Sequence, residues 1–463
     1  MNNSDKNHPN YGIIQCMRET VKLPPGPRGF LPLHIYYALY RDPLTTLQSL
    51  AHEYGDVVLL RIGRQPIYIV NHPTLVEEVV ITNSHQTSKR LGSRLMRRLL
   101  GNSVMSSQDE EHLKQRRMLQ PLFHRRHLAG FGETMVSCAR QVSERWQPGE
   151  TLDVFEEMTD LAMVVVGKTL FSAEFDAQAE EIRHALDVFM SRSRVTSMVV
   201  SELAEQLPLP TPRRMHDALR RLDRSIYGLI AERRRQKPQG DLLALLLEAE
   251  DENGKLSDTQ IRDQAMTIFL AGFETMAVTL TWTWYLLSQH PTIERCFQAE
   301  IDQVLAGRLP TADDLPKLTY TRQLLSEVLR LYPPVWAHGR RLAGAIRVGD
   351  WDLPDGAYVI FNTWLLHHDP RYYTDPERFD PGRWKDEPEV KRPRMSFAPF
   401  GAGPRQCIGE GFAWMEGVLL LATLGQNWQL RLATGHPVEL EPVLTLRPRY
   451  GMRMTLSPRA ELG

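Results

Sequence analysis

Phe400-Gly401-Ala402-Gly403-Pro404-Arg405-Gln406-Cys407-Ile408-Gly409 is the stretch of this chain that says most about its fold. Glycines on both sides of Cys407 let the backbone approach a bulky planar group closely. A helix that starts just after them points N–H groups toward the sulfur, which stabilises a thiolate. Arg405 could pair with an acidic group of the same ligand. These features suit a thiolate metal ligand in a protected bay, with a buried core cysteine on a glycine-rich loop as the alternative.

The clearest helix outside this loop is predicted from Asp258 to about Gln289. Ser257 followed by Gln260 makes a capping box at its start, and Pro291 follows its end. At 1.5 Å per residue the helix is expected to be roughly 48 Å long. Its middle, residues 268–273, is apolar nearly all round, so we expect it to pass through the core.

Apolar residues at three- and four-residue intervals predict further helices. They cover residues 153–171, 217–235 and about 321–331, and a last long helix begins at about Gly409. The third of these helices stops before Pro333-Pro334, where a helix cannot continue.

Strand patterns are few and short. β-Branched runs over residues 57–62 and 67–70 predict a hairpin, and residues 346–348 and 358–361 are further strand candidates. The pattern as a whole predicts a mainly α protein with a small β part. No repeat or linker divides the chain, so we expect a disordered lead over residues 1–22 and one domain over residues 23–463.

Charge and cysteine usage narrow the class of protein. The formal net charge is -1 at pH 7, so no basic field favours nucleic acid. The four cysteines show no zinc-type spacing, and so few in so long a chain indicate a reducing compartment rather than a disulfide framework. The polar N-terminus lacks the apolar part of a signal peptide or anchor, and no run of about 18 apolar residues occurs. We therefore expect a soluble, cytoplasmic protein without a membrane anchor.

Four motifs of this chain resemble those of the cytochrome P450 family, the haem-thiolate monooxygenases. Phe400, Gly403, Arg405, Cys407 and Gly409 are similar to the haem-binding signature of the family. In the same order as in the family, the other three motifs are Ala271-Gly272-Phe273-Glu274-Thr275 (the oxygen groove), Glu327 with Arg330, and Pro376-Glu377-Arg378-Phe379. The resemblance covers about residues 23–457. It implies the cytochrome P450 fold of a soluble bacterial type, with the long central helix over haem b (iron protoporphyrin IX).

The resemblance also implies how the cofactor is held. Cys407 would be the thiolate ligand of the iron, which pushes electron density onto the metal and favours O–O cleavage. Phe400 would pack beside the sulfur, limit water there and tune the reduction potential. Gly409 would complete the haem-binding signature. The propionates would be contacted by Arg405, His112, Arg116 and Arg340. Arg341 is the alternative to Arg340, and a surface helix histidine is the alternative for His112.

Glu274 and Thr275 are the predicted proton-delivery residues. Thr275 would hydrogen-bond oxygen or an ordered water, and Glu274 would pass protons from solvent. Gly272 and a bond from Thr275 to the carbonyl four residues earlier would let the helix open there. The intact acid–alcohol pair favours an O2-dependent monooxygenase. The alternatives are a peroxide-dependent haem-thiolate peroxygenase and a non-catalytic haem-binding sensor.

Glu327, Arg330 and Arg378 are predicted to form a buried structural ion network beside the thiolate face. Removing one partner of such a network strands a buried charge.

An apolar organic substrate is predicted because the expected pocket residues are mostly apolar. A terpenoid or a fatty acyl compound is a guess from bacterial relatives, and ordinary core packing is the alternative reading of each residue. The expected lining residues are Leu95, Met96, Leu99, Met190, Met198, Val199, Phe269, Ala271, Thr275, Val335, Trp336, His338, Tyr450, Gly451 and Met452.

Electrons are expected from a separate partner, because no flavin or ferredoxin domain is visible in the chain. Lys114, Arg117, Lys391, Arg392 and Arg394 flank the elements expected near the thiolate. We expect them to dock an acidic ferredoxin or flavodoxin, itself served by an NAD(P)H reductase. Plain solubility charges are the alternative.

Overall fold

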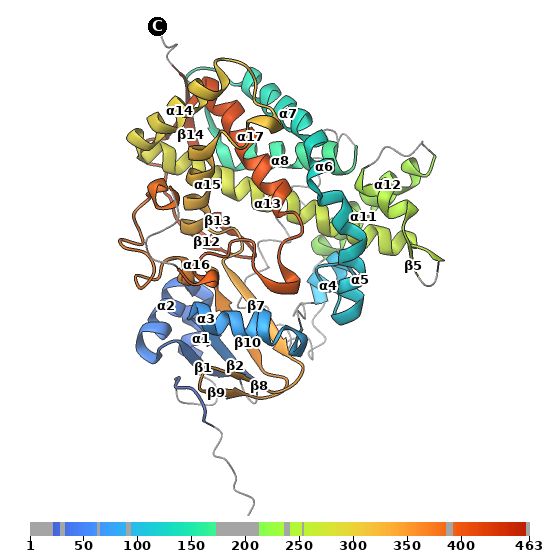
Figure 1. Ribbon diagram of the computed structural model, residues 1–463, viewed down its shortest axis with the longest axis vertical. Coiled ribbons are helices and arrows are strands. Elements are labelled where there is room, and N and C mark those ends of the chain that lie inside the picture. The colour runs from blue at the N-terminus through green and yellow to red at the C-terminus, as the bar shows by residue number, and fades with distance from the viewer. Residues whose placement is uncertain are drawn as a thin grey trace, which may run out of the picture.

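The computed structural model of the protein describes residues 22–27, 33–62, 65–88, 94–172, 213–235, 241–251, 254–385 and 392–459. Over these residues it is mainly helical with a small β part, as predicted (Figure 1). The helices are α1 (Leu33–Arg41), α2 (Pro43–Tyr54), α3 (Pro73–Glu77), α4 (Arg94–Leu100), α5 (Asp109–Leu119), α6 (Arg125–Leu128), α7 (Gly132–Arg145), α8 (Val154–Leu170), α11 (Arg213–Arg233), α12 (Leu242–Glu248), α13 (Asp258–Gln289), α14 (Pro291–Leu305), α15 (Thr319–Leu331), α16 (Thr363–His367) and α17 (Glu410–Asn427). Short helical turns include η1 (Glu78–Thr82), η6 (Pro381–Trp384), η7 (Arg394–Ser396) and η8 (Gly403–Arg405).

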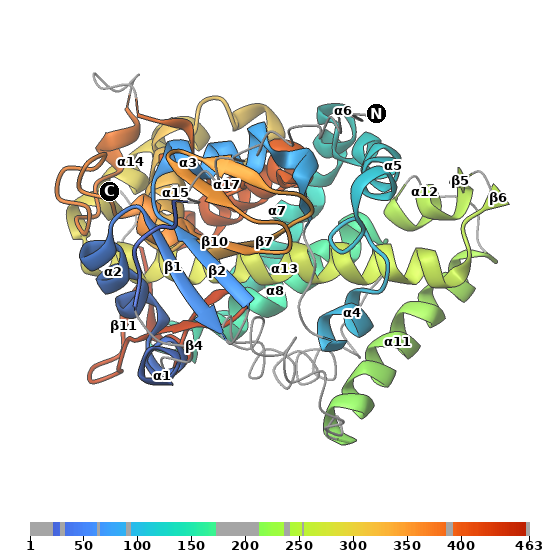
Figure 2. The same ribbon diagram turned by 90° about the horizontal axis from the view of Figure 1, so that it is seen from below.

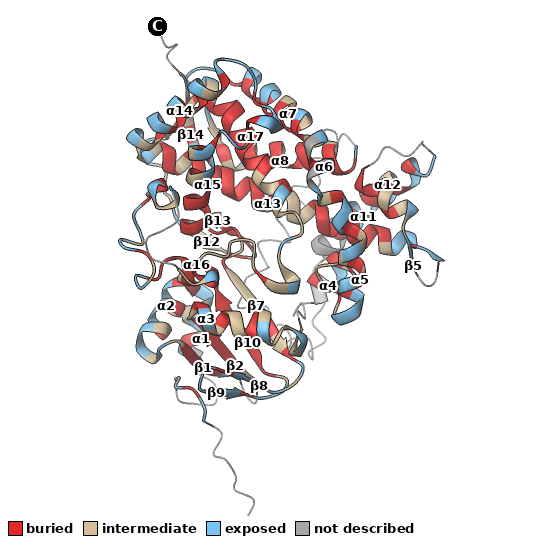
Figure 3. Cartoon of the chain, in the orientation of Figure 1, coloured by how far each residue is buried: buried red, intermediate tan, exposed pale blue. Residues whose placement is uncertain are grey.

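α13 runs through the middle of the molecule and organises the helical part (Figure 2). Its bounds are the predicted ones, and both hydrogen bonds of the capping box between Ser257 and Gln260 are present. α8 packs along it, and α11, α15 and α17 also contact it. Among the described residues it is the helix long and apolar enough to cross a membrane, yet 78% of its most apolar window is buried inside the protein. It is therefore a core helix, and Figure 3 shows it mostly buried.

The main sheet has the strand order β1-β2-β10-β7-β3. β10 is parallel to β2, and the other pairs are antiparallel. Val57 and Leu59 of β1 pack into one hydrophobic cluster, whereas Val58 and Leu60 pack into another on the opposite face. Successive side chains of a strand point to opposite faces, so a strand buried on both sides is a continuous apolar run. The sheet strands are β1 (Val57–Ile62), β2 (Gln65–Val70), β3 (Thr87–Ser88), β7 (Ala337–Leu342) and β10 (Tyr358–Asn362).

A hairpin near the C-terminus is fixed against α13. Trp282 of α13 donates its indole N–H to the carbonyl of Leu446 at 2.8 Å. Trp336 donates to the carbonyl of Val443 at 2.9 Å, and the Leu446 amide donates to the carbonyl of Pro334 at 3.0 Å. The hairpin strands are β12 (Leu440–Pro442) and β13 (Leu446–Pro448), beside a sheet of β11 (Trp428–Leu432), β14 (Arg453–Pro458) and β4 (Thr151–Asp153); the small pairs are β5 (Glu250–Asp251) with β6 (Gly254–Lys255) and β8 (Ile346–Val348) with β9 (Trp351–Leu353).

The predicted elements are present close to their expected bounds. β1 and β2 form the predicted hairpin, with Val57 opposite Val70. The other expected helices correspond to α8, α11, α15 and α17, and the further strand candidates to β8 and β10. Residues 1–21, most of the expected N-terminal lead, lie outside the described residues.

Candidate active site

Cys407 lies on a tight loop between η8 and the start of α17. Its amide donates to the carbonyl of Phe400 at 2.9 Å, and the Phe400 ring packs on Trp414 of α17 at 5.6 Å between centroids. Gly403 has φ +68°, and a Cβ there would lie 2.4 Å from the carbonyl oxygen of Val80. This glycine therefore serves the close packing of the loop on η1. Gly409 lies beside the sulfur, since a Cβ there would lie 4.0 Å from Cys407 Sγ.

The thiol of Cys407 has the surroundings expected of a metal ligand. α17 begins three residues later, at Glu410, with Gly409 as its N-cap. The amide dipoles of a helix favour negative charge at its N-terminus. The side chain is exposed, although the adjoining α17 is buried over most of its length. No group of three or more His, Cys, Asp or Glu that could hold a metal ion gathers among the described residues.

Three arginines converge near this loop from different elements. Arg116 of α5 donates to the carbonyl of Gln406 at 2.6 Å, and Arg405 donates to the carbonyl of Ser107 at 2.6 Å. Burial, with repulsion from Arg405, lowers the pKa of Arg340 to about 10. Burial also lowers the pKa of Arg405 to about 10, with Arg116 repelling it and Asp109 acting in the opposite sense.

Buried like charges of this kind are costly unless an anion compensates them. A flat ligand that carries two carboxylates and a metal needing one thiolate fits Cys407 and these arginines. Haem b has that chemistry. Of the two candidates on β7, Arg340 rather than Arg341 is the residue placed with Arg405, because Arg341 is half-buried over the ring of Tyr358.

His112 is buried on α5, one helical turn before Arg116. A surface histidine was the alternative reading, and the burial does not agree with it. His112 and Arg116 share one face because residues four apart on a helix are neighbours. The propionate contact predicted for His112 stays a prediction.

The middle of α13 is less buried than the turns on either side of it, although only the two ends of the helix are exposed. Ala271, Gly272 and Thr275 are half-buried, while Phe269 and Phe273 are buried. Thr275 donates its hydroxyl to the carbonyl of Ala271 at 2.9 Å, the predicted bond. α13 nevertheless continues as one helix through this point.

Gly272 has a different use from the predicted one. A Cβ on Gly272 would lie 2.9 Å from Cγ2 of Val166, so the missing side chain allows α8 to approach α13 closely. The missing side chain of Gly272 therefore serves close helix packing, and the opening of the helix at this point stays a prediction.

Glu274 is buried and fully engaged by the C-terminal hairpin. Its carboxylate accepts from Arg447 Nε at 2.6 Å and from a second guanidinium nitrogen at 2.7 Å. The hydroxyl of Thr445 donates to the same carboxylate at 2.7 Å. Neither Thr445 nor Arg447 was singled out from the sequence. They lie more than 170 residues from Glu274, and no local pattern marks the pairing.

The buried ion network at the end of α15 is present, with one change of membership. Arg330 pairs with Glu327 at 2.8 Å, and both side chains are fully buried. The predicted third side chain, Arg378, is exposed and takes part only through its carbonyl, which accepts from Arg330 at 3.1 Å. Arg383 of η6 binds Glu327 instead, at 3.2 Å, and Trp384 donates to Glu327 at 2.9 Å.

The sequence explains this error. Asp375-Pro376-Glu377-Arg378-Phe379 is followed at once by Asp380-Pro381-Gly382-Arg383-Trp384, a second copy of Asp-Pro-x-Arg-aromatic. The prediction chose the first copy, and the structure buries the second against Glu327.

The expected substrate residues divide into two sets. Ala271, Val335 and His338 are half-buried around the middle of α13 and the start of β7, whereas Met96, Leu99, Phe269 and Met452 are buried. Trp336 is fully buried in the cluster beneath the sheet and holds the hairpin, so its side chain has a structural partner. Tyr450 is exposed and Gly451 is half-buried. The side chain of Leu95, and Met190, Met198 and Val199, lie outside the described residues.

The residues expected to dock the redox partner differ in how exposed they are. Arg117 and Arg394 are exposed, and Lys114 is half-buried. Arg392 lies over the rings of Tyr373 and Trp384, at 4.9 and 5.0 Å, which is an internal role. Lys391 lies outside the described residues.

Known proteins with a similar sequence or structure belong to one group. The family model described as Cytochrome P450 matches residues 24–454. Cyclooctat-9-en-7-ol 5-monooxygenase of Streptomyces melanosporofaciens is 41% identical over 86% of this chain and 87% of its own length. Pentalenene oxygenase of Streptomyces avermitilis is 35% identical over 90% of this chain and 94% of its own length. Among solved structures, a retinoic-acid-bound cyanobacterial CYP120A1 superposes with a TM-score of 0.84 at 26% identity, covering 95% of this chain and 100% of that one.

Proposed function

The chain belongs to the cytochrome P450 family, and from this premise we propose that it is a monooxygenase that oxygenates a cyclic terpenoid. Two of its relatives are named for the oxygenation of cyclooctat-9-en-7-ol and pentalenene. The half-buried apolar side chains include Leu270 and Ala271 at the centre of α13 and Val335 just before β7, which suit an apolar ring system. A fatty acyl substrate is the less favoured choice, because neither relative is named for one.

The observation that carries the haem assignment is one exposed thiol beside three arginines. Cys407 would ligate the iron, and Arg116, Arg340 and Arg405 would face the carboxylates. When bound, the haem supplies reductive O2 cleavage, in which two electrons and two protons place one oxygen atom in the substrate and the other in water. Thr275 Oγ1 and the Glu274 carboxylate are the groups of this chain that would hold and pass the protons.

The thiolate assignment is tested with the spectrum of the reduced protein under carbon monoxide. We expect a strongly red-shifted Soret band, because a thiolate donates electron density to the iron. Cys407→Ala should lose this band while keeping its helical circular dichroism. Cys296→Ala removes another exposed thiol and should keep it. A red-shifted band that survives in Cys407→Ala would refute the assignment.

The substrate class is tested by titrating the ferric protein with compounds and recording the spin-state shift of the haem band. Cyclic terpene hydrocarbons and their mono-alcohols should bind more tightly than fatty acids of similar carbon number. Tighter binding of the fatty acids would overturn the terpenoid proposal. Turnover at full rate with peroxide and no reductase would favour the peroxygenase alternative instead.

We infer that electrons come from a separate acidic ferredoxin or flavodoxin in the cytoplasm. Exposed Arg117 and Arg394 lie on elements next to the Cys407 loop. Arg322, also exposed, stacks over Trp414 of α17 at 4.5 Å. Association through charge is weakened by salt.

The docking proposal is tested by stopped-flow reduction at increasing salt. The second-order rate should fall as salt rises, and Arg117→Glu should slow it. Arg347→Glu is the matched control, because Arg347 is exposed on β8, which pairs with β9 and not with α5 or the Cys407 loop. A rate insensitive to salt would count against docking by charge.

A further inference from the structure

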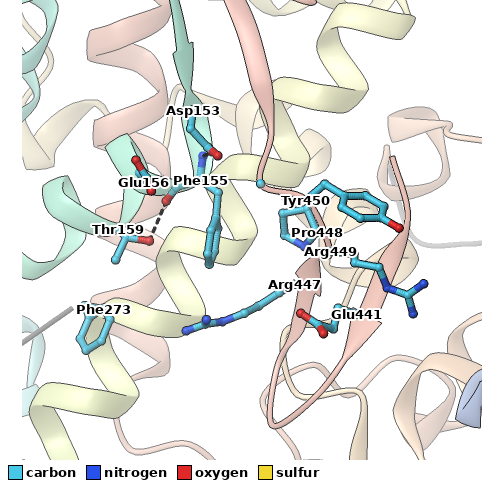
Figure 4. A pocket seen from close by; sticks show the side chains of 11 residues that line it. Asp153, Phe155, Glu156, Thr159, Phe273, Glu441, Arg447, Pro448, Arg449 and Tyr450 are labelled. Carbon is cyan, nitrogen blue, oxygen red and sulfur yellow. Dashed lines mark hydrogen bonds between the residues drawn. The ribbon is translucent and has the colours of Figure 1, made fainter. Parts of the chain in front are cut away.

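A polar cavity lies under the C-terminal hairpin, between β13, the start of α8 and α13 (Figure 4). Its volume is about 250 Å³, which leaves room for several waters. Asp153, Thr159 and Phe273 line it together with Arg447 and Tyr450. Tyr450 is exposed, so this wall faces solvent, whereas Phe273 belongs to the core helix.

Arg447 is the residue common to this cavity and to Glu274. It lines the cavity, and its guanidinium binds both carboxylate oxygens of Glu274. Its Cζ lies 5.2 Å from the ring centroid of Phe155, another lining residue. The Arg447 side chain keeps 11% exposure, while Glu274 keeps 4%. Arg447 therefore lies between the cavity and a carboxylate that is otherwise closed off.

We infer that this cavity is the water entrance to the proton relay, and that Arg447 is the positioning residue that holds Glu274 at its inner end. The inference rests on the proposed function, because a monooxygenase consumes protons at this point of α13. Thr275, the residue after Glu274, donates its hydroxyl to the carbonyl of Ala271, one of the predicted substrate residues. The route from Glu274 to solvent runs past Arg447.

The proton balance of this route is simple. An excess proton from bulk solvent, carried as hydronium by the cavity waters, passes to the Glu274 carboxylate as one hydrogen bond from Arg447 or Thr445 is released, and leaves a neutral water behind. Glu274 then gives that proton through a bridging water to Thr275 Oγ1, because consecutive residues of a helix do not face each other, and the proton of Thr275 moves on toward the active site. Arg447 stays protonated throughout, so one proton crosses and no group is consumed. Asp153, Glu156 and Glu441 line the cavity and attract cations to the entrance, with Arg449, also in the lining, opposing them.

A purely structural reading of the same contacts is that Glu274 only anchors the hairpin. Both readings predict that Arg447→Met destabilises the protein and that adding Glu274→Gln restores part of the loss, because a stranded buried charge is removed. A decisive test must therefore follow water and protons rather than stability.

The first test fills the cavity and measures turnover of the reductase-coupled holoenzyme with its substrate. Thr159→Met projects into the cavity from α8. It should divert electrons to peroxide and raise the solvent isotope effect on kcat, in the same direction as Glu274→Gln, which should lower kcat by about 10²-fold. Arg447→Lys keeps a cation, so its diversion of electrons to peroxide and its solvent isotope effect should lie between those of wild type and Arg447→Met.

Thr169→Met is the matched control for that test. Thr169 is a buried threonine of the same helix, bonds its own i−4 carbonyl as Thr159 does, and is absent from the cavity wall. Thr159→Leu replaces Thr159→Met if the latter does not fold. The inference would be overturned if a folded cavity-filling variant kept the coupling and the solvent isotope effect of the wild type.

The second test needs no turnover and uses the ferric resting protein. In Arg447→Met the buried Glu274 has lost its cation, which favours the protonated acid. The C=O infrared band of that acid should appear in Arg447→Met and be absent from the Glu274→Gln/Arg447→Met double variant. In D2O that band should shift within the mixing time, and adding Thr159→Met should slow the shift. If Thr159→Met leaves the rate of this exchange unchanged, the proposed water entrance is overturned, even if the protein oxygenates none of the compounds tested. A wild type without a thiolate spectrum would instead refute the proposed function.

Discussion

Glu416, in the middle of α17, is a carboxyl group buried to 1% exposure. One of its oxygens has no hydrogen-bond partner among the described residues. Burial raises the pKa of this carboxyl well above its usual value. When folding raises the pKa of an acid, the folded protein binds that proton more tightly than the unfolded chain does. The free energy of unfolding therefore falls as the pH rises above the pKa of the unfolded chain.

Replacing Glu416 by Gln should therefore stabilise the protein, by about 1–3 kcal/mol at neutral pH. The gain should be small near pH 4 and grow as the pH rises through and above the usual range of a glutamate. Thermal unfolding at several pH values measures it. Glu133→Gln, at an exposed position of α7, is the control and should show no such trend. A Glu416→Gln variant less stable than wild type at pH 8 would show that this carboxylate has a stabilising partner.

The tandem motif that misled the sequence prediction supplies a second test at single residues. Arg383→Ala removes a side chain that binds buried Glu327 and is itself only 13% exposed, so it should cost about 1.5–3 kcal/mol. Arg378→Ala keeps the carbonyl that Arg330 uses and should change stability by less than about 0.5 kcal/mol. Urea unfolding of the two variants measures the contrast. Equal losses would mean that the side chain of Arg378 also contributes.

At the scale of elements, the packing of α8 on α13 depends on one missing side chain. Gly272→Ala would place a methyl group 2.9 Å from Cγ2 of Val166, a β-branched residue with little freedom to turn away. We expect a loss of about 1–3 kcal/mol from overpacking. In a Val166→Ala background the same change should cost less, because the obstructing methyl is gone. Chemical unfolding of the four-variant cycle measures the coupling, and strict additivity would contradict it.

Local sequence signals were enough to predict these elements. The bounds of α13 follow from a capping box and a proline, and the end of α15 follows from Pro333-Pro334. The two faces of the sheet follow from apolar runs in β1 and β2. What could not be predicted are the contacts that join distant elements, such as Glu274 with Arg447 or Arg116 with the carbonyl of Gln406. These depend on how elements meet in space, and no residue spacing encodes that.

At the scale of the whole molecule, residues from α5, β7 and the Cys407 loop place like charges around one point. Arg340 and Arg405 hold pKa values lowered to about 10 by burial, so each is an electrostatic cost to the folded chain. A cofactor with carboxylates would offset that cost, and its binding would be linked to folding.

These arginines should therefore lower the stability of the protein most when haem is absent. Arg340→Met should stabilise the haem-free protein by about 1–3 kcal/mol, yet should speed the loss of haem from the loaded protein. Thermal unfolding of both forms and haem transfer to a scavenger protein measure the two effects. Arg341→Met is the control, since Arg341 is half-buried over Tyr358, and should show no such reversal. Destabilisation of both forms by Arg340→Met would contradict the electrostatic account.

The turn at residues 443–446 has a practical meaning for anyone who designs mutant libraries to widen substrate range. A loop beside a binding region usually invites diversification, since loops tolerate change. Here two tryptophan indoles, a proline carbonyl and the Glu274 carboxylate hold three of the four positions of that turn, Val443, Thr445 and Leu446. Randomising it would yield many clones lost to misfolding before selectivity could be scored, so codons are better varied elsewhere.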